Sequence, residues 1–362
     1  GGFERVIVTM LHCYKRKSKM KKELILLFLI FLITSCTEDK RQPGIKQLQH
    51  EVLDFPDMMI GSPGDIQKEG DCLLVLDIQQ DSLFHRVDLA NNRYRGMFGA
   101  KGQGPEEFVH PCGLKALGDG RWACFDHGKN DVNMISLDAD GNMVGLSRMF
   151  KNKAFMTFNI VPLSEELFIL NGETDGAMLA LIDKEGTVLS VSDEYPYKDD
   201  AEKNIPVRFR AMAYQGTLRV NDNGYVAYAF RGAKQVHLYK VENKMIKKVG
   251  EVIDGYGHYK PDMRREGAYG SAHDSNYPEC YLDLALTDKH VYALYSGRTY
   301  KEYRLSAFEG ETVYVYDWTG NLLKTYQLDV PITRFCIDDE EQVMYATANV
   351  PEPTIVSFEL GE

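Results

Sequence analysis

The chain has 362 residues, 44% of them hydrophobic, and carries 42 Lys and Arg against 53 Asp and Glu, a formal net charge of −11. This length is ample for a large hydrophobic core, while the acidic excess repels nucleic acid and anionic lipid headgroups. The composition therefore argues against a nucleic-acid partner and against membrane binding through a basic patch.

The first 35 residues differ from the rest of the chain. We interpret residues 1–19 as an upstream extension outside the mature protein, and residues 20–35 as a lipoprotein signal peptide. Lys21 and Lys22 precede ten unbroken apolar residues, Leu24–Ile33, whereas a membrane span takes about 20. Residues 1–35 hold seven basic and two acidic residues, so the remainder has a net charge of 35 − 51 = −16.

A cysteine follows this apolar segment. Ile33-Thr34-Ser35-Cys36 resembles a bacterial lipobox, in which the Cys thiol is acylated and becomes the new N-terminus. The resemblance implies a lipid anchor at Cys36, a tether over residues 36–44, and a cell-envelope location at the outer membrane, facing the periplasm or the surface. Glu38 and Asp39 are similar to the surface-export signals of Bacteroidetes lipoproteins, and an ordinary solvated linker is the alternative. A signal peptide with a chance Cys, or a buried helix, is the alternative for the whole segment.

From residue 45 to residue 362, short runs rich in Val, Ile, Leu, Tyr and Phe alternate with Gly, Asn and Asp turns. This pattern is typical of antiparallel strands joined by hairpins. The runs recur as six units with a spacing of about 45–65 residues, a period typical of propellers and solenoids. The units are Leu73–Leu89, Arg121–Leu137, Glu166–Ile182, Tyr225–Tyr239, His290–Tyr316 and Val343–Phe358.

The repeat predicts an all-β fold, a six-bladed β-propeller of four-stranded antiparallel blades. Four strands cannot bury both faces of a sheet alone, but radial stacking covers each face with a neighbouring sheet. The last unit lacks a fourth strand, and Glu51–Phe55 is the candidate to supply it and close the ring. A two-sheet sandwich, or two small β domains, is the alternative architecture.

The segment Phe98–Phe108 contains three glycines and a proline between two aromatic residues, and it predicts a sharp connector between blades. Gly99–Phe108 resembles the blade-joining loop of NHL-type repeats. Together with Ser296-Gly297-Arg298, Val315–Gly320 and Cys336-Ile337-Asp338, it makes residues 45–360 similar to the TolB-like six-bladed propeller lipoproteins of Bacteroidetes. The resemblance implies a fold and an envelope location. It transfers no functional residue, because that group has no common substrate.

Loops that join the second and third strands of each blade share a propeller face with the blade connectors, and this face carries most ligand sites. Arg231 and Arg298 each lie beside a Gly after an apolar strand, where a guanidinium could grip a carboxylate or sulfate, or form a salt bridge between blades. The alternative for any single residue is an ordinary solvated loop side chain. The candidate ligand-binding residues are Asp126, His127, Glu173, Arg231, Arg298, Tyr300 and Asn349.

These residues favour a non-catalytic envelope protein that needs no cofactor and binds a partner protein, a peptide or a glycan. The alternative is a metal-dependent propeller hydrolase or lyase acting on a lactone or sugar, with Glu173, Asn130 and Asp126 around Ca²⁺ and His127 as a general base. Oxygens converging on one point near the axis would favour the enzyme. Mutually paired side chains in the channel would favour the binding protein.

Two further features of the sequence bear on the site. Glu251–Cys280 interrupts the repeat, and its aromatic residues predict either a stacking surface or a loop that packs on itself. The five cysteines after Cys36 are odd in number and form no CxxC pair, so a zinc site is not expected.

Overall fold

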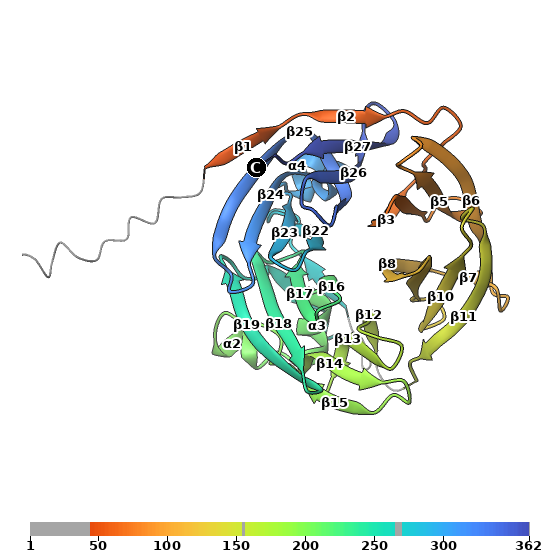
Figure 1. Ribbon diagram of the computed structural model, residues 1–362. Coiled ribbons are helices and arrows are strands. Elements are labelled where there is room, and N and C mark those ends of the chain that lie inside the picture. Colours follow the sequence, from red (N-terminus) through yellow and green to blue (C-terminus); the bar gives the residue numbers. More distant parts are fainter. Residues whose placement is uncertain (1–43, 154–155, 265–269, 362) are drawn as a thin grey trace, which may run out of the picture. The chain divides into compact units, whose positions relative to one another are not determined.

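The computed structural model describes residues 44–153, 156–264 and 270–361. The described residues between 44 and 361 form six blades of antiparallel strands around a central axis, as Figure 1 shows, and this confirms the predicted propeller. The predicted extension, signal peptide and lipidation site at Cys36 lie outside the described residues. Within the described part of the chain, no helix is long and apolar enough to cross a bilayer.

Each blade runs from an inner strand at the axis to an outer strand at the circumference. Blade 1 comprises β3 (Pro63–Glu69), β4 (Cys72–Asp77), β5 (Ser82–Asp88) and β6 (Arg93–Lys101), with β7 (Glu107–Phe108) beside β6. Blade 2 comprises β8 (Pro111–Gly118), β9 (Arg121–Asp126), β10 (Asp131–Leu137) and β11 (Met143–Lys151). Blade 3 comprises β12 (Thr157–Pro162), β13 (Leu167–Thr174), β14 (Ala177–Asp183) and β15 (Val188–Val191). Blade 4 comprises β16 (Gly216–Val220), β17 (Tyr225–Phe230), β18 (Gln235–Glu242) and β19 (Met245–Ile253).

Blades 5 and 6 share one strand. Blade 5 comprises β22 (Tyr281–Leu286), β23 (His290–Tyr295), β24 (Gly310–Asp317) and the first part of β25 (Leu322–Ile337). The second part of β25 is the inner strand of blade 6, followed by β26 (Val343–Asn349) and β27 (Pro353–Glu359). The two blades are therefore one continuous sheet.

The N-terminal segment closes the ring. β1 (Ile45–Leu48) pairs in parallel with β25, and β2 (His50–Leu53) pairs antiparallel with β27, from His50 opposite Phe358 to Leu53 opposite Ile355. β2 is therefore the fourth strand of blade 6, as the sequence predicts. Figure 1 shows β1 and β2 following the circumference of the propeller.

The core lies between the blades. Second and third strands are buried on both faces, because each blade is covered by a neighbour on either side. Leu73, Leu74, Val75 and Leu76 of β4, for example, are all fully buried. Such strands read as continuous apolar runs, and the six sequence units correspond to the second and third strands of the six blades.

The glycine-rich connector passes from β6 to β8 as predicted. Phe98 stacks on Phe84 at 5.3 Å between ring centroids, and Phe108 meets the same ring edge-on at 5.2 Å. Gly99 has φ +76°, and a Cβ there would lie 2.6 Å from the Phe84 ring. Glycine is thus required by both backbone and space, and the two aromatic residues fix the ends of the turn.

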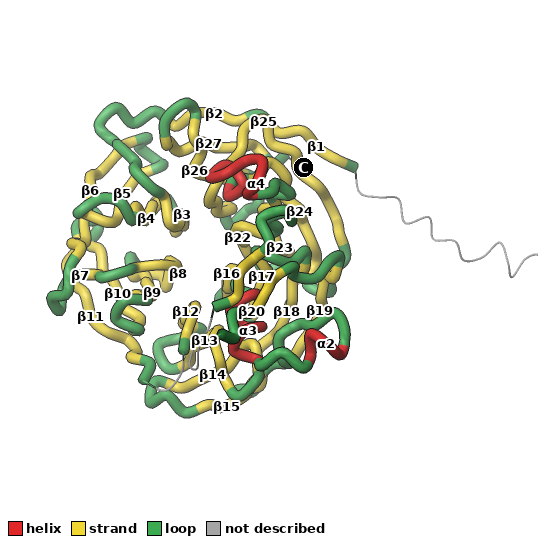
Figure 2. The backbone as a smooth tube through the Cα atoms, turned by 180° about the vertical axis from the view of Figure 1, so that it is seen from behind, coloured by secondary structure: helices red, strands yellow, loops and turns green. Residues whose placement is uncertain are grey.

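Three insertions build up one face of the propeller beside blades 4 to 6, and the sequence pattern predicts none of their helices. Figure 2 shows the helices in red. They are α2 (Asp200–Lys203) and α3 (Val207–Ala213) before blade 4, and α4 (Tyr300–Tyr303) and η1 (Arg304–Phe308) between β23 and β24. The third insertion, between blades 4 and 5, contains the hairpin β20 (Tyr259–Pro261) and β21 (Ser271–His273).

The blade 4–5 insertion packs on itself and on α3. His258 stacks on Tyr277 at 3.4 Å between ring centroids and an interplanar angle of 6°, and Tyr259 meets Tyr214 edge-on at 6.0 Å. Ser271 Oγ donates a hydrogen bond to the Phe209 carbonyl. These aromatic side chains are therefore engaged with each other, as the self-packed alternative predicts.

Candidate functional site

A cavity of about 430 Å³ opens at the axis, on the face that carries the insertions. We call it the funnel. It is lined by residues near the start of the inner strands of all six blades, and by Arg231 and Phe308. Its volume lies within the range of small-ligand sites. The charged residues in its lining are three arginines, Arg219, Arg231 and Arg334, against two aspartates, Asp65 and Asp283.

β-Bulges shape the floor of the funnel. In every blade except blade 4, the pairing of the inner strand with the second strand shifts register near the inner strand's first residues. A bulge re-aims the side chain that follows it. The residues after the five bulges are Asp65, Leu114, Asn159, Asp283 and Arg334.

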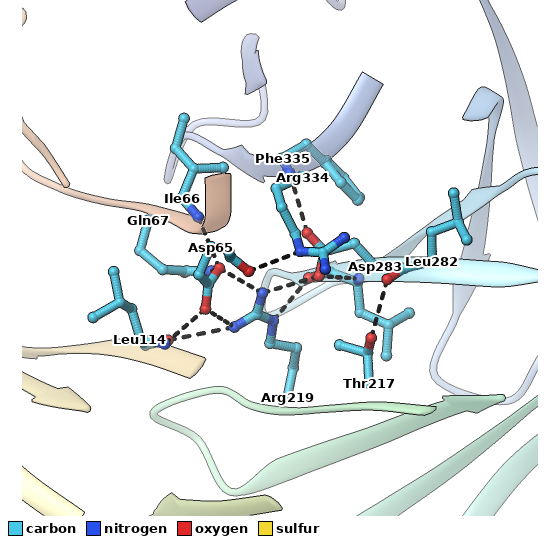
Figure 3. Close-up of polar contacts among 12 residues, drawn as sticks. Asp65, Ile66, Gln67, Leu114, Thr217, Arg219, Leu282, Asp283, Arg334 and Phe335 are labelled. Atoms are coloured by element: carbon cyan, nitrogen blue, oxygen red, sulfur yellow. Dashed lines mark hydrogen bonds and ion pairs between the residues drawn. The ribbon is translucent and has the colours of Figure 1, made fainter. Parts of the chain in front are cut away.

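Arg219 of blade 4 binds two of these residues across the axis (Figure 3). Its Nη1 and Nη2 contact the two carboxylate oxygens of Asp65 at 2.8 and 2.7 Å, and Nη2 also contacts Asp283 Oδ1 at 2.9 Å. Arg219 Nε donates to the Leu284 carbonyl at 3.2 Å. One arginine therefore joins blades 1, 4 and 5, and we call Asp65, Arg219 and Asp283 the axial cluster.

Backbone amides complete the coordination of both carboxylates. Asp65 accepts hydrogen bonds from the amides of Ile66 and Leu114, and Asp283 accepts from those of Leu284 and Phe335. Burial raises the pKa of Asp65, but the Arg219 guanidinium and these amides outweigh burial and lower it overall. Burial raises the pKa of Asp283, against the opposing charges of Arg219 and Arg334.

Further bonds link consecutive blades around the same floor. Asn159 Nδ2 donates to the Gly216 carbonyl at 3.3 Å, Thr217 Oγ1 to the Leu282 carbonyl at 3.2 Å, and Arg334 Nε to the Gly64 carbonyl at 2.8 Å. The inner strands are thereby held by paired polar groups. Below Arg219, the channel narrows to a space of about 140 Å³.

Arg231 stands on the wall of the funnel at the end of β17. Its backbone amide donates to the Gln215 carbonyl at 3.0 Å, and its carbonyl accepts from the Cys280 amide at 2.6 Å. Its guanidinium lies 5.8 Å from the Phe308 ring centroid, and its Nε lies 3.4 Å from Glu279 Oε2. The side chain is nevertheless 54% exposed. Arg231 thus has a fixed backbone and an accessible charge.

Glu279 lies beneath this arginine and was not identified from the sequence. It is 5% exposed, and its Oε2 has no hydrogen-bond donor among the described residues. Burial raises the pKa of Glu279, with Arg231 acting in the opposite direction. His273 Nε2 lies 4.0 Å from Glu279 Oε1. Burial lowers the pKa of His273, and the Arg231 charge lowers it further. The carboxylate of Glu279 is therefore positioned to orient Arg231.

Arg298, the second predicted arginine, is engaged within its own insertion. Its Nη2 contacts Glu311 at 2.8 Å, Nη1 donates to the Ser306 carbonyl at 3.1 Å, and Nη1 lies 3.7 Å from Glu309. Asn349 Nδ2 donates to Glu309 Oε1 at 2.7 Å, and the Tyr300 ring lies 6.0 Å from that of Phe308. Four predicted residues therefore meet at the 306–311 segment, but only Arg231 lines the funnel.

The predicted residues of blades 2 and 3 have local partners. Asp126 is fully buried and accepts from the amides of Val109 and His110 at 2.8 and 2.9 Å. Asp77 makes the equivalent bonds in blade 1, to Gly61 and Ser62, so this position fastens the end of the second strand to the start of the inner strand. His127 is exposed and meets the rings of His110 and Phe125 edge-on. Glu173 is half-buried, with its amide bonded to the Met156 carbonyl.

The calcium alternative required Glu173, Asn130 and Asp126 to converge. The carboxylate oxygens of Asp126 accept hydrogen bonds from backbone amides, and Asn130 Nδ2 donates to the Asn152 carbonyl at 3.1 Å. Within the described ranges, no group of three or more His, Cys, Asp or Glu side chains could hold a metal ion. The five cysteines from Cys72 onward are all free thiols.

Several residues of the site were missed by the sequence analysis: Asp65, Arg219, Glu279, Asp283, Phe308 and Arg334. The available signal is a charge placed inside an otherwise apolar inner strand, as in Asp283 of the run Tyr281–Leu286. A charge that is buried between blades must be paired, so such positions predict partners across the axis.

A second cavity, of about 740 Å³, opens on the opposite face among the turns of blades 4, 5 and 6. Many of its side chains are bound within the turns themselves. Asp288, for example, accepts from Asn223 Nδ2 at 2.6 Å, and Asp338 accepts from the amides of Gln342 and Val343. These contacts within and between turns hold this face of the propeller together.

Comparisons with known proteins agree with this architecture. The sequence matches no curated protein. Among solved structures, a "putative exported protein" from Bacteroides fragilis is 15% identical, with 87% of this chain and 99% of that chain covered and a TM-score of 0.55. The β-propeller domain of Cps50 (Swd1) from Myceliophthora thermophila is 10% identical, with 86% and 100% covered and a TM-score of 0.50. These likenesses concern the fold alone.

The family model described as "TolB-like 6-blade propeller-like" matches residues 42–340, which include the first five blades and the inner strand of blade 6. The match agrees with the six blades, the closing strand and the connector described above. The chain belongs to the TolB-like six-bladed propeller family.

Proposed function

We propose that this protein is a non-catalytic binding protein of the cell envelope, which holds an anionic group of a partner protein, peptide or glycan in the funnel. Arg231 carries the proposal. It is an exposed guanidinium with a fixed backbone, on the wall of a cavity of about 430 Å³. Charge-assisted hydrogen bonds from arginine are among the strongest available to a binding site.

The state of the axial carboxylates favours binding over the hydrolase or lyase alternative. Asp65 and Asp283 are occupied by Arg219 and by backbone amides. A cation at the axis would have to displace Arg219 from both carboxylates, leaving the arginine buried without a partner. The paired side chains of the channel support the binding proposal.

The proposed location is the cell envelope, with the propeller tethered to the outer membrane through a lipid on Cys36. The lipobox-like Ile33–Cys36 supports this proposal, as does the likeness to a protein described as exported. The first described strand begins at Ile45, so a tether of nine residues separates the anchor from the propeller.

Metabolic labelling with radioactive palmitate tests the anchor. We expect the wild-type chain to incorporate the label and Cys36→Ser to lose it entirely, because the thiol is the acylated group. Processing should stop in the same variant, so its precursor should migrate more slowly on a gel. Equal labelling of both chains would refute the anchor.

Affinity capture from cell-envelope extracts tests the binding site. We expect Arg231→Ala to recover at least about tenfold less of any specific partner than wild type, since a charge-assisted bond accounts for a factor of this order. Arg264→Ala is the matched control, because Arg264 is 88% exposed and pairs only with Asp262 in the described part of the chain. Recovery of every partner by Arg231→Ala at the level of Arg264→Ala would remove the funnel as the site.

A further inference from the structure

The funnel has features that specify its ligand more closely. We propose that it receives the free C-terminal carboxylate of a peptide chain, with the terminal amino groups of the Arg231 guanidinium as the anchor. This inference rests on the proposed function, because it assumes that the funnel is the recognition site. It adds the chemical class of the ligand and the part of the ligand that enters.

Arg231 has one edge engaged and one edge available. Its Nε lies 3.4 Å from Glu279 Oε2, and its Cζ lies 5.8 Å from the centroid of the Phe308 ring. A guanidinium carries five N–H donors in a rigid fork, and the structure records no hydrogen bond from those of Arg231 to another described residue. The two terminal nitrogens can therefore accept a second carboxylate in a bidentate contact, while Glu279 and Phe308 hold the plane of the group.

The charges of the funnel favour a singly charged anion over a doubly charged one, because three arginines, Arg219, Arg231 and Arg334, face three carboxylates, Asp65, Asp283 and Glu279. Arg219 is neutralised by Asp65 and Asp283, and Arg334 is bound to two backbone carbonyls, those of Gly64 and Thr333. The charge of Arg231 is opposed by a single buried carboxylate, that of Glu279. A phosphate, with close to two charges, would need more uncommitted cations than the cavity offers.

The remaining lining favours a peptide over an acidic sugar. Sugar hydroxyls need hydrogen-bond acceptors as well as donors, yet the carboxylates of Asp65 and Asp283 are already saturated by amides and Arg219. Phe308, which is half-buried and lies beside Arg231, supplies an apolar wall. The last residue of a peptide can place its carboxylate at the Arg231 guanidinium and an apolar side chain against this wall.

The shape of the funnel selects a chain end. Below the opening, Arg219 crosses the axis between Asp65 and Asp283. The funnel above it has a volume of about 430 Å³, whereas the cavity below it has a volume of about 140 Å³. A segment from the middle of a chain would have to leave again through the same opening or break the axial cluster. A terminus can enter and stop at the floor.

Equilibrium dialysis with two pools of tetrapeptides tests this inference. The pools have the same randomised sequences, and one has a free C-terminal carboxylate whereas the other has a C-terminal amide. We expect wild type to retain the free-acid pool at least about tenfold more than the amide pool, enriched in apolar C-terminal residues. Arg231→Gln should retain both pools at the amide level, and Arg264→Gln should behave as wild type.

Equal retention of the two pools, or undiminished retention of the free-acid pool by Arg231→Gln, would overturn the inference. So would retention of a glucuronate-containing oligosaccharide in preference to the peptides. If both variants have the melting temperature of the wild type, a folding defect is excluded. Affinity capture distinguishes failure of this inference from failure of the proposed function. If Arg231→Ala loses the partner but wild type retains both peptide pools equally, only the C-terminal carboxylate is refuted. If Arg231→Ala recovers as much partner as wild type, the binding site itself is refuted.

Discussion

Arg219→Met is expected to lower the free energy of unfolding by about 3–5 kcal/mol. The substitution removes the cation that pairs with both Asp65 and Asp283, which are 1% exposed. Two buried carboxylates would then face each other across the axis, with the charge of Arg334 left to oppose that of Asp283. Urea denaturation at neutral pH, followed by tryptophan fluorescence, measures the difference.

Two controls separate the lost ion pairs from other effects of the substitution. Arg121→Met removes an arginine whose pair with Glu165 is mostly exposed, and should cost less than about 1 kcal/mol. Adding Asp65→Asn and Asp283→Asn to Arg219→Met removes the uncompensated charges and should restore much of the stability. If Arg219→Met costs no more than Arg121→Met, the axial cluster does not stabilise the fold.

Removal of the closing strand is the second large effect. A mature chain that starts at Asp54 lacks β1 and β2, and we expect it to be less stable by about 4 kcal/mol or more than a chain that starts at Gly44. The loss combines the buried side chain of Leu48 with the backbone pairing of β1 to β25 and of β2 to β27. For a domain of this size, the melting temperature should fall by about 6 °C or more.

A synthetic peptide of residues 44–55 provides the matching control. It should restore the melting temperature of the shortened chain in a concentration-dependent manner, because a strand that binds only the folded state stabilises that state. A peptide with the same composition in scrambled order should have no effect. A shortened chain that melts within about 2 °C of the full one would show that the ring is stable while open.

The sequence was sufficient to predict the propeller because its determinants are local and repeated. Each turn, such as Asp138–Asn142 or Asp317–Asn321, is fixed by a side chain that bonds the backbone a few residues away. The buried second strands show as apolar runs. Even the closing strand was predicted, because counting strands left blade 6 one short.

The axial cluster could not be predicted in the same way. Asp65 and Arg219 are 154 residues apart, and their meeting depends on the bulges that turn inner-strand side chains toward the axis. A one-residue register shift changes the pattern of apolar residues in a strand sequence very little. The short helices were missed for a related reason: α3 has seven residues, and its burial against β13, β20 and β21 reflects tertiary packing more than periodicity.

Arg231 and Arg298 show where site prediction from sequence stops. Both follow an apolar strand and adjoin a glycine, so the local signal is the same. Arg298 is neutralised by Glu309 and Glu311, which reach it only because η1 folds back between β23 and β24. The geometry of the insertion leaves Arg298 paired with two carboxylates and Arg231 54% exposed beside one.

The pairing of the first strands with the last has a consequence for biosynthesis. Lys46 bonds the carbonyl of Leu360, a separation of 314 residues along the chain, and β2 finds its partner only in β27. While the polypeptide emerges, its leading segment has no docking edge until translation is nearly finished. The first five blades can form one after another, whereas the propeller ring closes in a single late step.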